Sequence, residues 1–315
     1  MKRKLKLNAF EKFGFELEYM IVDRDTLSVK SFADELIKIP SKKYSHCFEN
    51  KEICWSYELV NHLIELKTNG PAADIRNSEK YFFKNIKQIN SLLKKYNAQL
   101  LPTAMHPFMN PVNETQIWKR RYRKFYRQYS DTFNCRRHGW ANIQSMHINL
   151  PFCNNEEFEK LFAAIRLILP IIPALAASSP VVENKITGLM DSRLEFYRKT
   201  QTLVPFLTGK IIPEQIFNIK DYKTQILQKI YSSLKPYDEK NIFQFEWMNL
   251  RGARARFMRN AIEIRVIDMQ ESPISDISIA AAVISLTEAL FNGFFIEEKK
   301  QKQWKQQKQK KQKST

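Results

Sequence analysis

GFELEY, residues 14–19, has the alternating pattern of an extended strand with two different faces. Side chains of an extended strand alternate between two faces, so Phe15, Leu17 and Tyr19 lie together on one face. Glu16 and Glu18 then lie together on the other face, ~6.5 to 7 Å apart along the strand. One face can pack into a core, and the opposite face carries two neighbouring carboxylates.

Three later segments, LIELKT (63–68), SMHINL (145–150) and AIEIRVID (261–268), divide in the same way. Their apolar residues fall on one face, while Glu65, His147 and Glu263 fall on the other. An ordinary solvated strand explains any one of these segments, but solvated faces also draw freely on Lys, Thr, Ser and Gln. Four strands with acidic or histidine side chains on the polar face favour a shared site.

Carboxylates on neighbouring strands repel one another, by ~4 kcal/mol for an unscreened pair at ~4 Å in a medium of effective dielectric about 20. A cation therefore belongs among them, and Mg²⁺ is held by a few carboxylates together with substrate phosphates. Arg265 follows Glu263 by two residues and is placed to neutralise a phosphoryl group in transfer. The pattern predicts a metal site for a phosphorylated substrate.

The strands mix apolar and polar residues, which favours an antiparallel sheet, because buried parallel strands are nearly continuous apolar runs. The predicted strands are residues 13–22, 62–68, 99–105, 142–150 and 261–268, and the predicted helices are residues 75–96, 156–177, 191–200, 221–234 and 275–295. No internal repeat and no linker rich in Gly, Pro or Ser divides the chain. We therefore expect a single α+β domain over residues 1–296.

The composition limits the class of protein. With 315 residues, 43% of them hydrophobic, the chain can build a sizeable core, and no apolar run reaches the length of a membrane helix. No secretion signal is recognisable, and four cysteines without a CxxC pair suit reduced thiols in the cytoplasm. The net charge is +18, and the eight lysines of residues 299–315 supply eight of these charges. We expect this Lys/Gln-rich tail, residues 297–315, to be disordered.

Two basic segments lie inside the part that we expect to fold, WKRRYRKFYRQ (118–128) and RGARARFMR (251–259). Such segments suit nucleic acid, and they equally suit the phosphates of a nucleotide. The chain has seven glycines and contains neither a GxGxxG motif after a strand nor a P-loop. If a nucleotide binds, metal ions and arginines must hold it.

Longer blocks of sequence point to a family. The blocks GFELEY, YELVNHLIELKT, AMHPF, HGWANIQSMHINLPF, ALAASSPVVENKITGLMDSRLEFYRKTQTLVPFLTGKIIPE and IEIRVIDMQ follow one another from residue 14 to residue 270. In this order they resemble the glutamate-cysteine ligase family 2, the YbdK-type carboxylate-amine ligases of the glutamine synthetase superfamily. The resemblance implies a curved antiparallel sheet flanked by helices, of the glutamine synthetase and guanidino kinase catalytic-domain type.

The resemblance also implies a reaction and its cofactors. Such ligases pass the γ-phosphoryl group of ATP to a substrate carboxylate, and an amine then attacks the acyl phosphate to form an amide. The implied cofactors are ATP and Mg²⁺, with Mn²⁺ as the alternative metal, and the implied substrates are a carboxylate of glutamate type and an amine such as cysteine.

The same resemblance assigns roles to residues. His147 is expected beside the nucleotide phosphates and Arg265 at the transferred phosphate, both as catalytic residues. The implied metal ligands are Glu16, Glu18, Glu65 and Glu263. We further expect three arginines, Arg198, Arg251 and Arg254, to bind the nucleotide.

Other residues have two interpretations. Glu58 is either a further acid of the site or a surface glutamate, and His106, beside a proline, is more typical of a structural turn than of a ligand. Arg193, Arg198 and Gln201 either line the amino-acid pocket or are solvated helix positions.

Two other functions stay open. A phosphotransferase of the same superfamily would use the same site without forming an amide. A nucleic-acid-binding protein would use the basic segments, but that function leaves the strand carboxylates unexplained. We expect no membrane partner, nucleic-acid contact through the tail at most as an accessory, and a homodimer.

Overall fold

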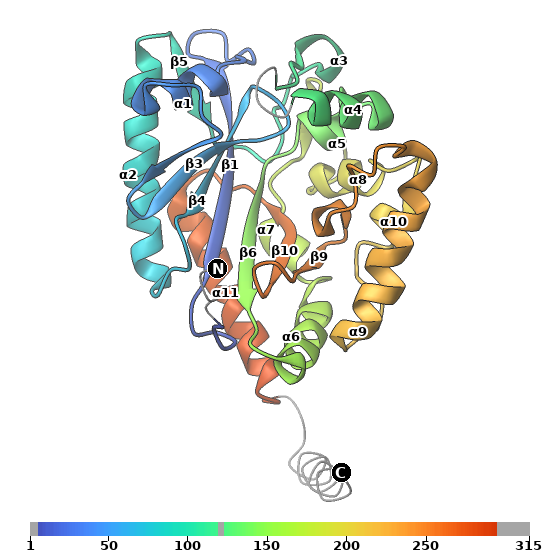
Figure 1. The fold of residues 1–315 in the computed structure, drawn as a ribbon. Helices are drawn as coiled ribbons and strands as arrows, with labels where there is room; N and C mark the ends of the chain where they lie inside the picture. Colours follow the sequence, from blue (N-terminus) through green and yellow to red (C-terminus); the bar gives the residue numbers. More distant parts are fainter. Residues whose placement is uncertain (1–5, 119–122, 295–315) are drawn as a thin grey trace, which may run out of the picture.

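An antiparallel sheet forms the centre of the molecule in the computed structural model, which describes residues 6–118 and 123–294 (Figure 1). Its central strand is β1 (Gly14–Asp23), which contains the GFELEY stretch. β1 pairs with β4 (Leu63–Thr68) on one side and with β6 (Ser145–Pro151) on the other. The strands that were predicted to carry the polar site are therefore direct neighbours.

The sheet extends outward from both of these partners. Beyond β4 lie β3 (Ile53–Tyr57) and β2 (Cys47–Asn50), and beyond β6 lie β10 (Ala261–Asp268) and β9 (Ala253–Arg256). β5 (Ala98–Leu101) pairs with the last residues of β1. Every pairing in this sheet of eight described strands is antiparallel, which confirms the predicted α+β class.

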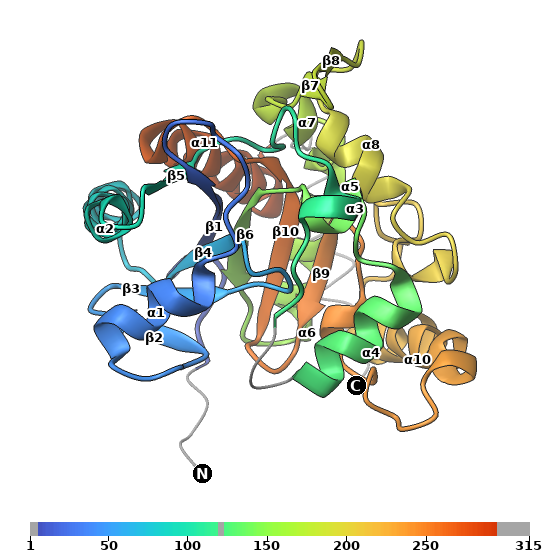
Figure 2. The ribbon, with the colours of Figure 1, turned by 90° about the horizontal axis from the view of Figure 1, so that it is seen from above.

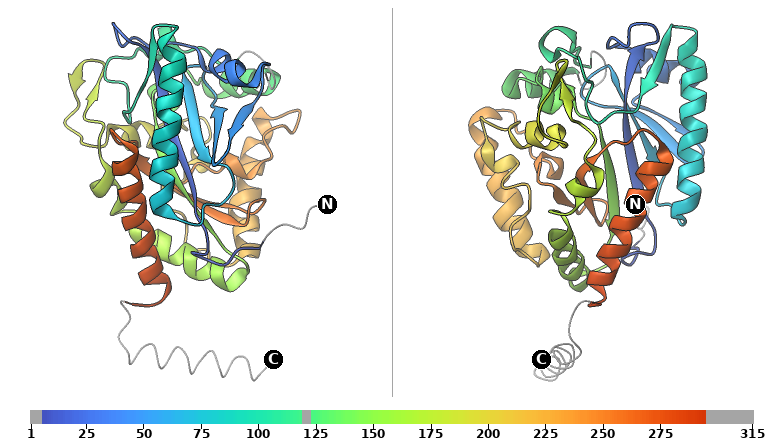
Figure 3. Two further views of the ribbon diagram at one scale, coloured as in Figure 1. Left: turned by 90° about the vertical axis from the view of Figure 1, so that its left-hand side faces the viewer. Right: turned by 180° about the vertical axis from the view of Figure 1, so that it is seen from behind.

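Three long helices cover the apolar face of the sheet (Figures 1 and 3). α11 (Pro273–Phe291) contacts both α2 (Ile75–Lys94) and α6 (Asn155–Ile168). Phe15 and Leu17 of β1 are completely buried in the core beneath these helices. By length and composition alone α11 would also pass as a membrane-crossing helix, but it packs against α2, α6 and the sheet core in the described structure.

Shorter helices surround the polar face, with α4, α5, α8 and α10 on the side away from α2 (Figure 2). The remaining elements are α1 (Ala33–Ser41), α3 (Pro111–Glu114), α4 (Arg123–Phe133), α5 (His138–Ala141), α7 (Ile172–Ala176), the hairpin β7 (Val181–Val182) and β8 (Lys185–Ile186), α8 (Ser192–Arg198), α9 (Ile219–Tyr222), a π-helical stretch Lys223–Leu227, α10 (Gln228–Leu234), and 3-10 turns at Pro205–Leu207, Lys235–Tyr237 and Glu246–Met248.

The strand register sets which polar side chains meet. Residues directly opposite each other in an antiparallel pair point to the same face of the sheet. Glu16 lies opposite His147, and Glu18 lies opposite Glu65. Glu263 lies opposite Asn149 on β6, two residues from His147 on the same face. The alternation in the sequence thus places all these groups on one side, as predicted.

The structure differs from the sequence-based prediction in several elements. The helix predicted over residues 156–177 is divided into α6 and α7, because Pro170 lacks the backbone N–H that a continuous helix requires. β3 was not predicted, since all five of its residues are buried and its sequence therefore shows no alternation. The Lys/Gln-rich tail, residues 297–315, lies outside the described residues, so its disorder and its nucleic-acid contact stay predictions.

Candidate active site

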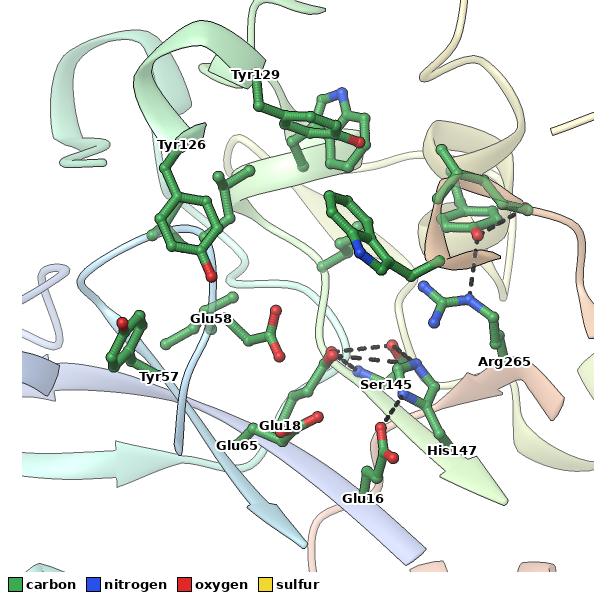
Figure 4. A pocket seen from close by; sticks show the side chains of 18 of the residues that line it. Glu16, Glu18, Tyr57, Glu58, Glu65, Tyr126, Tyr129, Ser145, His147 and Arg265 are labelled. Carbon is green, nitrogen blue, oxygen red and sulfur yellow. Dashed lines mark hydrogen bonds and ion pairs between the residues drawn. The ribbon is translucent and has the colours of Figure 1, made fainter. Parts of the chain in front are cut away.

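A cavity of about 540 Å³ lies against the polar face of the sheet (Figure 4). β1, β3, β4 and β6 supply one side of it, and α4, α5, α8 and the segment before β9 supply the other. The predicted site residues that line it are Glu16, Glu18, Glu65, His147, Arg254 and Arg265. Glu263 is fully buried directly beside them.

Glu16, His147 and Glu263 form a cluster in which one ligand atom from each lies within 4.8 Å of the other two. His147 Nδ1 lies 3.2 Å from Glu16 Oε2, and Asn149 Nδ2 donates to Glu16 Oε1 at 3.1 Å. Two carboxylates and an imidazole on a buried surface are a donor set that a divalent cation accepts.

Glu16 is held in its charged form. Burial by itself would raise the pKa of Glu16, but the hydrogen bond with His147 and the positive charges of His147 and Lys67 outweigh burial, so its pKa lies below the ordinary value. Glu16 is therefore ready to bind a cation at neutral pH.

A second acidic group adjoins the first. Glu18 Oε2 accepts hydrogen bonds from Ser145 N at 2.7 Å and Ser145 Oγ at 2.9 Å. Glu65 Oε2 accepts from Ser56 Oγ at 2.7 Å and from Lys67 Nζ at 2.5 Å. These bonds fix the positions of both carboxylates on the cavity floor, which the strands form.

Glu58, for which the sequence left two interpretations, also lines the cavity (Figure 4). Its carboxyl points into the space between Tyr126 and Glu18. Burial, followed by the negative charges of Glu65 and Glu18, raises the pKa of Glu58 well above its usual range. This raised pKa favours the protonated, neutral form of Glu58, which reduces the repulsion among the three carboxyl groups.

Arginines of β9 and β10 form ion pairs with Glu263. Its carboxylate accepts hydrogen bonds from Arg254 Nη2 at 2.7 Å, from Arg265 Nη1 at 2.5 Å and from Arg256 Nη1. Burial alone would raise the pKa of Glu263, but the three guanidinium groups hold it well below its usual value. Three cations around one anion leave an excess of positive charge on this side of the cavity.

Tyr197 on α8 fixes the position of Arg265. Its hydroxyl accepts a hydrogen bond from Arg265 Nε at 3.4 Å and donates one to Leu250 O at 2.7 Å. Arg254 lies close to Arg265, and burial together with the repulsion between these two cations lowers the pKa of Arg254 to about 10. An anion entering this region would relieve that repulsion.

Two arginines that were predicted to bind the nucleotide lie elsewhere. Arg251 is buried behind the cavity, where its guanidinium pairs with Glu214 through contacts of 2.7 Å and 2.6 Å. Arg198 is exposed on α8 and pairs with Glu195 at 2.9 Å. Neither side chain lines the cavity, because Arg251 precedes β9 and Arg198 is on the outer side of α8. Of the three predicted arginines, Arg254 alone faces the site.

The residues with two interpretations are also placed. His106 is buried, and its Nε2 lies 2.7 Å from Leu27 O, so it is a structural turn residue. Arg193 is buried and its Nε pairs with Asp268 Oδ1 at 2.5 Å, so it neither lines the cavity nor faces solvent. Gln201 is buried as well.

The sequence-based prediction missed one side of the cavity. We call this side the aromatic wall; it consists of Tyr57, Phe125, Tyr126, Tyr129, Trp140 and Trp247. Three of these residues belong to α4, within the segment that reads as strongly basic. Their signal was the apolar spacing of Phe125, Tyr129 and Phe133, four residues apart on one helix face.

A solved protein structure has a similar fold. The chain superposes on a bifunctional glutathione synthetase from Pasteurella multocida with a TM-score of 0.50, at 12% identity, over 88% of this chain and 39% of that one. Identity this low makes the likeness one of fold.

The sequence profile of glutamate-cysteine ligase family 2 (GCS2) matches residues 12–307. The chain therefore belongs to this family of carbon–nitrogen ligases, and the resemblance seen in the sequence is confirmed.

Two relatives illustrate the range of the family. An uncharacterized protein of Archaeoglobus fulgidus is 34% identical over 276 residues, which cover 88% of this chain and 74% of that protein. A Bradyrhizobium sp. protein, named as a predicted glutamate–cysteine ligase 2, is 24% identical over 89% of this chain and 62% of its own length.

Proposed function

We propose that this protein is an ATP- and Mg²⁺-dependent carboxylate–amine ligase of the glutamate–cysteine ligase type. The observation that carries the proposal is the cluster of Glu16, His147 and Glu263, with Arg265 bonded to Glu263. A cation-binding donor set beside a fixed guanidinium is what transfer of a phosphoryl group requires.

The donor sets indicate where metal ions would bind. Glu16, His147 and Glu263 would hold one Mg²⁺, or Mn²⁺ in its place, and Glu18 and Glu65 would hold a second cation. Bound there, the ions would neutralise the phosphate oxygens of the nucleotide.

A second cavity, of about 470 Å³, is where we place the nucleotide. It shares Glu16, Lys67 and Arg259 with the first cavity, so the two meet beside the cluster. Lys12 adds a further positive charge, and Phe13 offers an apolar surface for a base. Phosphates entering from this side would reach the cluster first.

The chain's own groups then account for the chemistry. Arg265, held by Tyr197, would stabilise the phosphoryl group as it passes from ATP to the substrate carboxylate. An amine would attack the resulting acyl phosphate, the C–N bond would form as the C–O bond to phosphate breaks, and a cavity carboxylate would receive the proton.

The test is release of ADP in the presence of Mg²⁺, ATP and paired amino acids and amines, with the product identified by mass spectrometry. We expect ADP release that requires both substrates, and loss of release in Glu16→Gln. The matched control is Glu49→Gln on the exposed side of β2, which should behave as the wild type. ADP release without any amine would contradict the ligase.

One alternative uses the same site. A phosphotransferase would give a phosphorylated product of the acceptor, whereas the ligase gives a dehydrated adduct of carboxylate and amine. Deleting residues 299–315 tests the nucleic-acid alternative, since binding that disappears with these lysines at moderate salt belongs to the tail.

We further propose a homodimer that works in the cytoplasm. The four cysteines are free thiols, and the surface of α6 and α7 exposes Leu167, Ile171 and Leu175 by 63%, 47% and 52%. Light scattering after size exclusion gives the mass directly, and a monomeric mass for Leu175→Glu but not for the wild type would support this face as the contact.

A further inference from the structure

The aromatic wall forms a continuous surface of rings. Tyr57 and Tyr126 meet edge to face with centroids 6.4 Å apart, Phe125 and Trp247 at 5.2 Å, and Tyr129 and Trp140 at 5.2 Å. Phe125, Tyr126, Trp140 and Trp247 are partly exposed, and all four line the first cavity. Their accessible ring surface therefore faces the cavity.

The cavity also has two electrically different sides. Arg254, Arg256 and Arg265 lie on β9 and β10, and they give one side an excess of positive charge. Glu58, between Tyr126 and Glu18, marks the opposite side, and Figure 4 shows Arg265 across the cavity from Tyr57 and Tyr126. A substrate carboxylate and its acyl phosphate are drawn to the arginines. The rings of Tyr57 and Tyr126 lie across the cavity from Arg265, so the amine partner would occupy the side where the rings are.

We propose that the amine substrate carries an aromatic ring, as in an arylalkyl amine or an aromatic amino acid, and that the aromatic wall binds this ring. The proposal rests on the proposed ligase function and names its acceptor class. The ammonium group first gives one proton to water, and the free amine nitrogen then forms the C–N bond to the acyl carbon. Phosphate leaves with the electrons of the broken C–O bond, and a cavity carboxylate receives the second proton of the nitrogen.

The size of the wall favours a ring over a small amine. Ammonium or cysteine can enter the same cavity, but neither has a flat apolar group to place against Tyr126 and Trp247. A ring packed edge to face or offset against these residues excludes water from both surfaces. One such contact corresponds to about a tenfold gain in binding.

The experiment compares acceptors in the ADP-release assay with ATP, Mg²⁺ and glutamate. The panel is ammonium, cysteine, alanine, phenylalanine, tyrosine, phenethylamine and tyramine. We expect the aromatic amines to have kcat/KM about tenfold or more above alanine and cysteine. Equal or higher kcat/KM for cysteine or ammonium would overturn the acceptor proposal while leaving the ligase intact. No ADP release with any amine, under conditions where ATP binds, would instead contradict the ligase function.

Variants of the wall give a second readout. Tyr126→Leu keeps an apolar side chain on α4 but removes the ring, and it should raise the KM for the aromatic amine about tenfold without a matching rise in the KM for ATP. Phe83→Ala, on the exposed surface of α2, is the control and should leave both constants as in the wild type. Equal changes in the two constants for Tyr126→Leu would refute a direct contact.

Binding can also be followed without turnover. Trp140 and Trp247 line the cavity, so their fluorescence should change when phenethylamine binds to the Mg²⁺- and ATP-loaded protein. The change should saturate at a lower concentration than with propylamine, which has the same charge and no ring. The same saturation concentration for both amines would refute recognition by the rings.

Discussion

Glu263→Gln tests the charge arrangement at the centre of the site most directly. The change keeps the shape of a fully buried side chain and removes the negative charge to which Arg254, Arg256 and Arg265 all bond. Removing one partner of a buried ion group costs roughly 3 to 5 kcal/mol. Arg254 Nη1 keeps a second acceptor, Trp247 O at 2.7 Å, so we expect the lower end, about 3 kcal/mol of unfolding free energy.

Urea denaturation followed by tryptophan fluorescence measures this loss. With a slope of about 3 kcal/mol per molar urea for a chain of this size, the midpoint should fall by about 1 M with the slope unchanged. Glu49→Gln on β2 is again the matched control and should leave the midpoint in place. A Glu263→Gln midpoint equal to that of the wild type would show that the three arginines do not depend on this carboxylate.

The pH dependence sharpens the same test. The pKa of Glu263 in the folded protein lies well below the ordinary value of 4.5, so its contribution is complete above pH 4.5. This contribution is lost as the pH falls through the folded pKa, because the protonated carboxyl resembles the glutamine. The stability difference between wild type and Glu263→Gln should therefore be full at pH 7 and should narrow below pH 4.5.

Three further predictions concern residues around the site. Burial lowers the pKa of His62 to about 4 from 6.5, so protonation of His62 destabilises the folded protein as the pH falls. Between pH 7 and pH 4 the wild type should therefore lose about 3 kcal/mol more unfolding free energy than His62→Gln, as measured by urea denaturation at each pH. Arg193→Leu leaves the buried Asp268 without its arginine partner and should lower the unfolding free energy by roughly 3 to 5 kcal/mol. Arg198→Ala, on the surface, should lower it by under about 1 kcal/mol, and urea denaturation measures both changes. Gly139→Ala would bring a Cβ to within 2.6 Å of Phe196 O, so α5 should shift against α8, the melting temperature should fall, and KM for the acceptor should rise.

Each of these has an outcome that would contradict it. A parallel pH dependence in wild type and His62→Gln would place the titrating group elsewhere. Similar losses for the Arg193 and Arg198 variants would mean that burial does not distinguish the two ion pairs. A Gly139→Ala protein with unchanged melting temperature and KM would show that α5 and α8 can separate without consequence.

The sequence predicts the strands that alternate and misses those that do not. β10 was predicted with the bounds that the structure shows, because one of its faces is apolar and the other carries the site. β3 is buried on both faces and gave no period-two pattern. The carboxylates of the site were therefore predictable from local patterning, and the neighbours that β3 contributes to the cavity were not.

Long-range register accounts for the other differences. RGARAR contains three arginines at similar spacing, and only the pairing of β9 with β10, which sets Arg254 opposite Glu263, distinguishes Arg254 from Arg251. The aromatic wall likewise depends on how α4 docks over β3, and the many charges of its sequence obscured the ring face. Neither the strand pairing nor the position of α4 over β3 can be predicted from a short window of sequence.

The meeting of the two cavities at Glu16, Lys67 and Arg259 has a consequence for the order of events. Each cavity includes a residue with large solvent exposure, Phe245 at 47% in the first and Met258 at 70% in the second. On the proposed function, the nucleotide in the second cavity and the acceptor in the first would therefore each border solvent and would meet only beside these three shared residues. Initial-rate patterns should show a random-order sequential mechanism, in which neither the spent nucleotide nor the amide product has to wait for the other to leave.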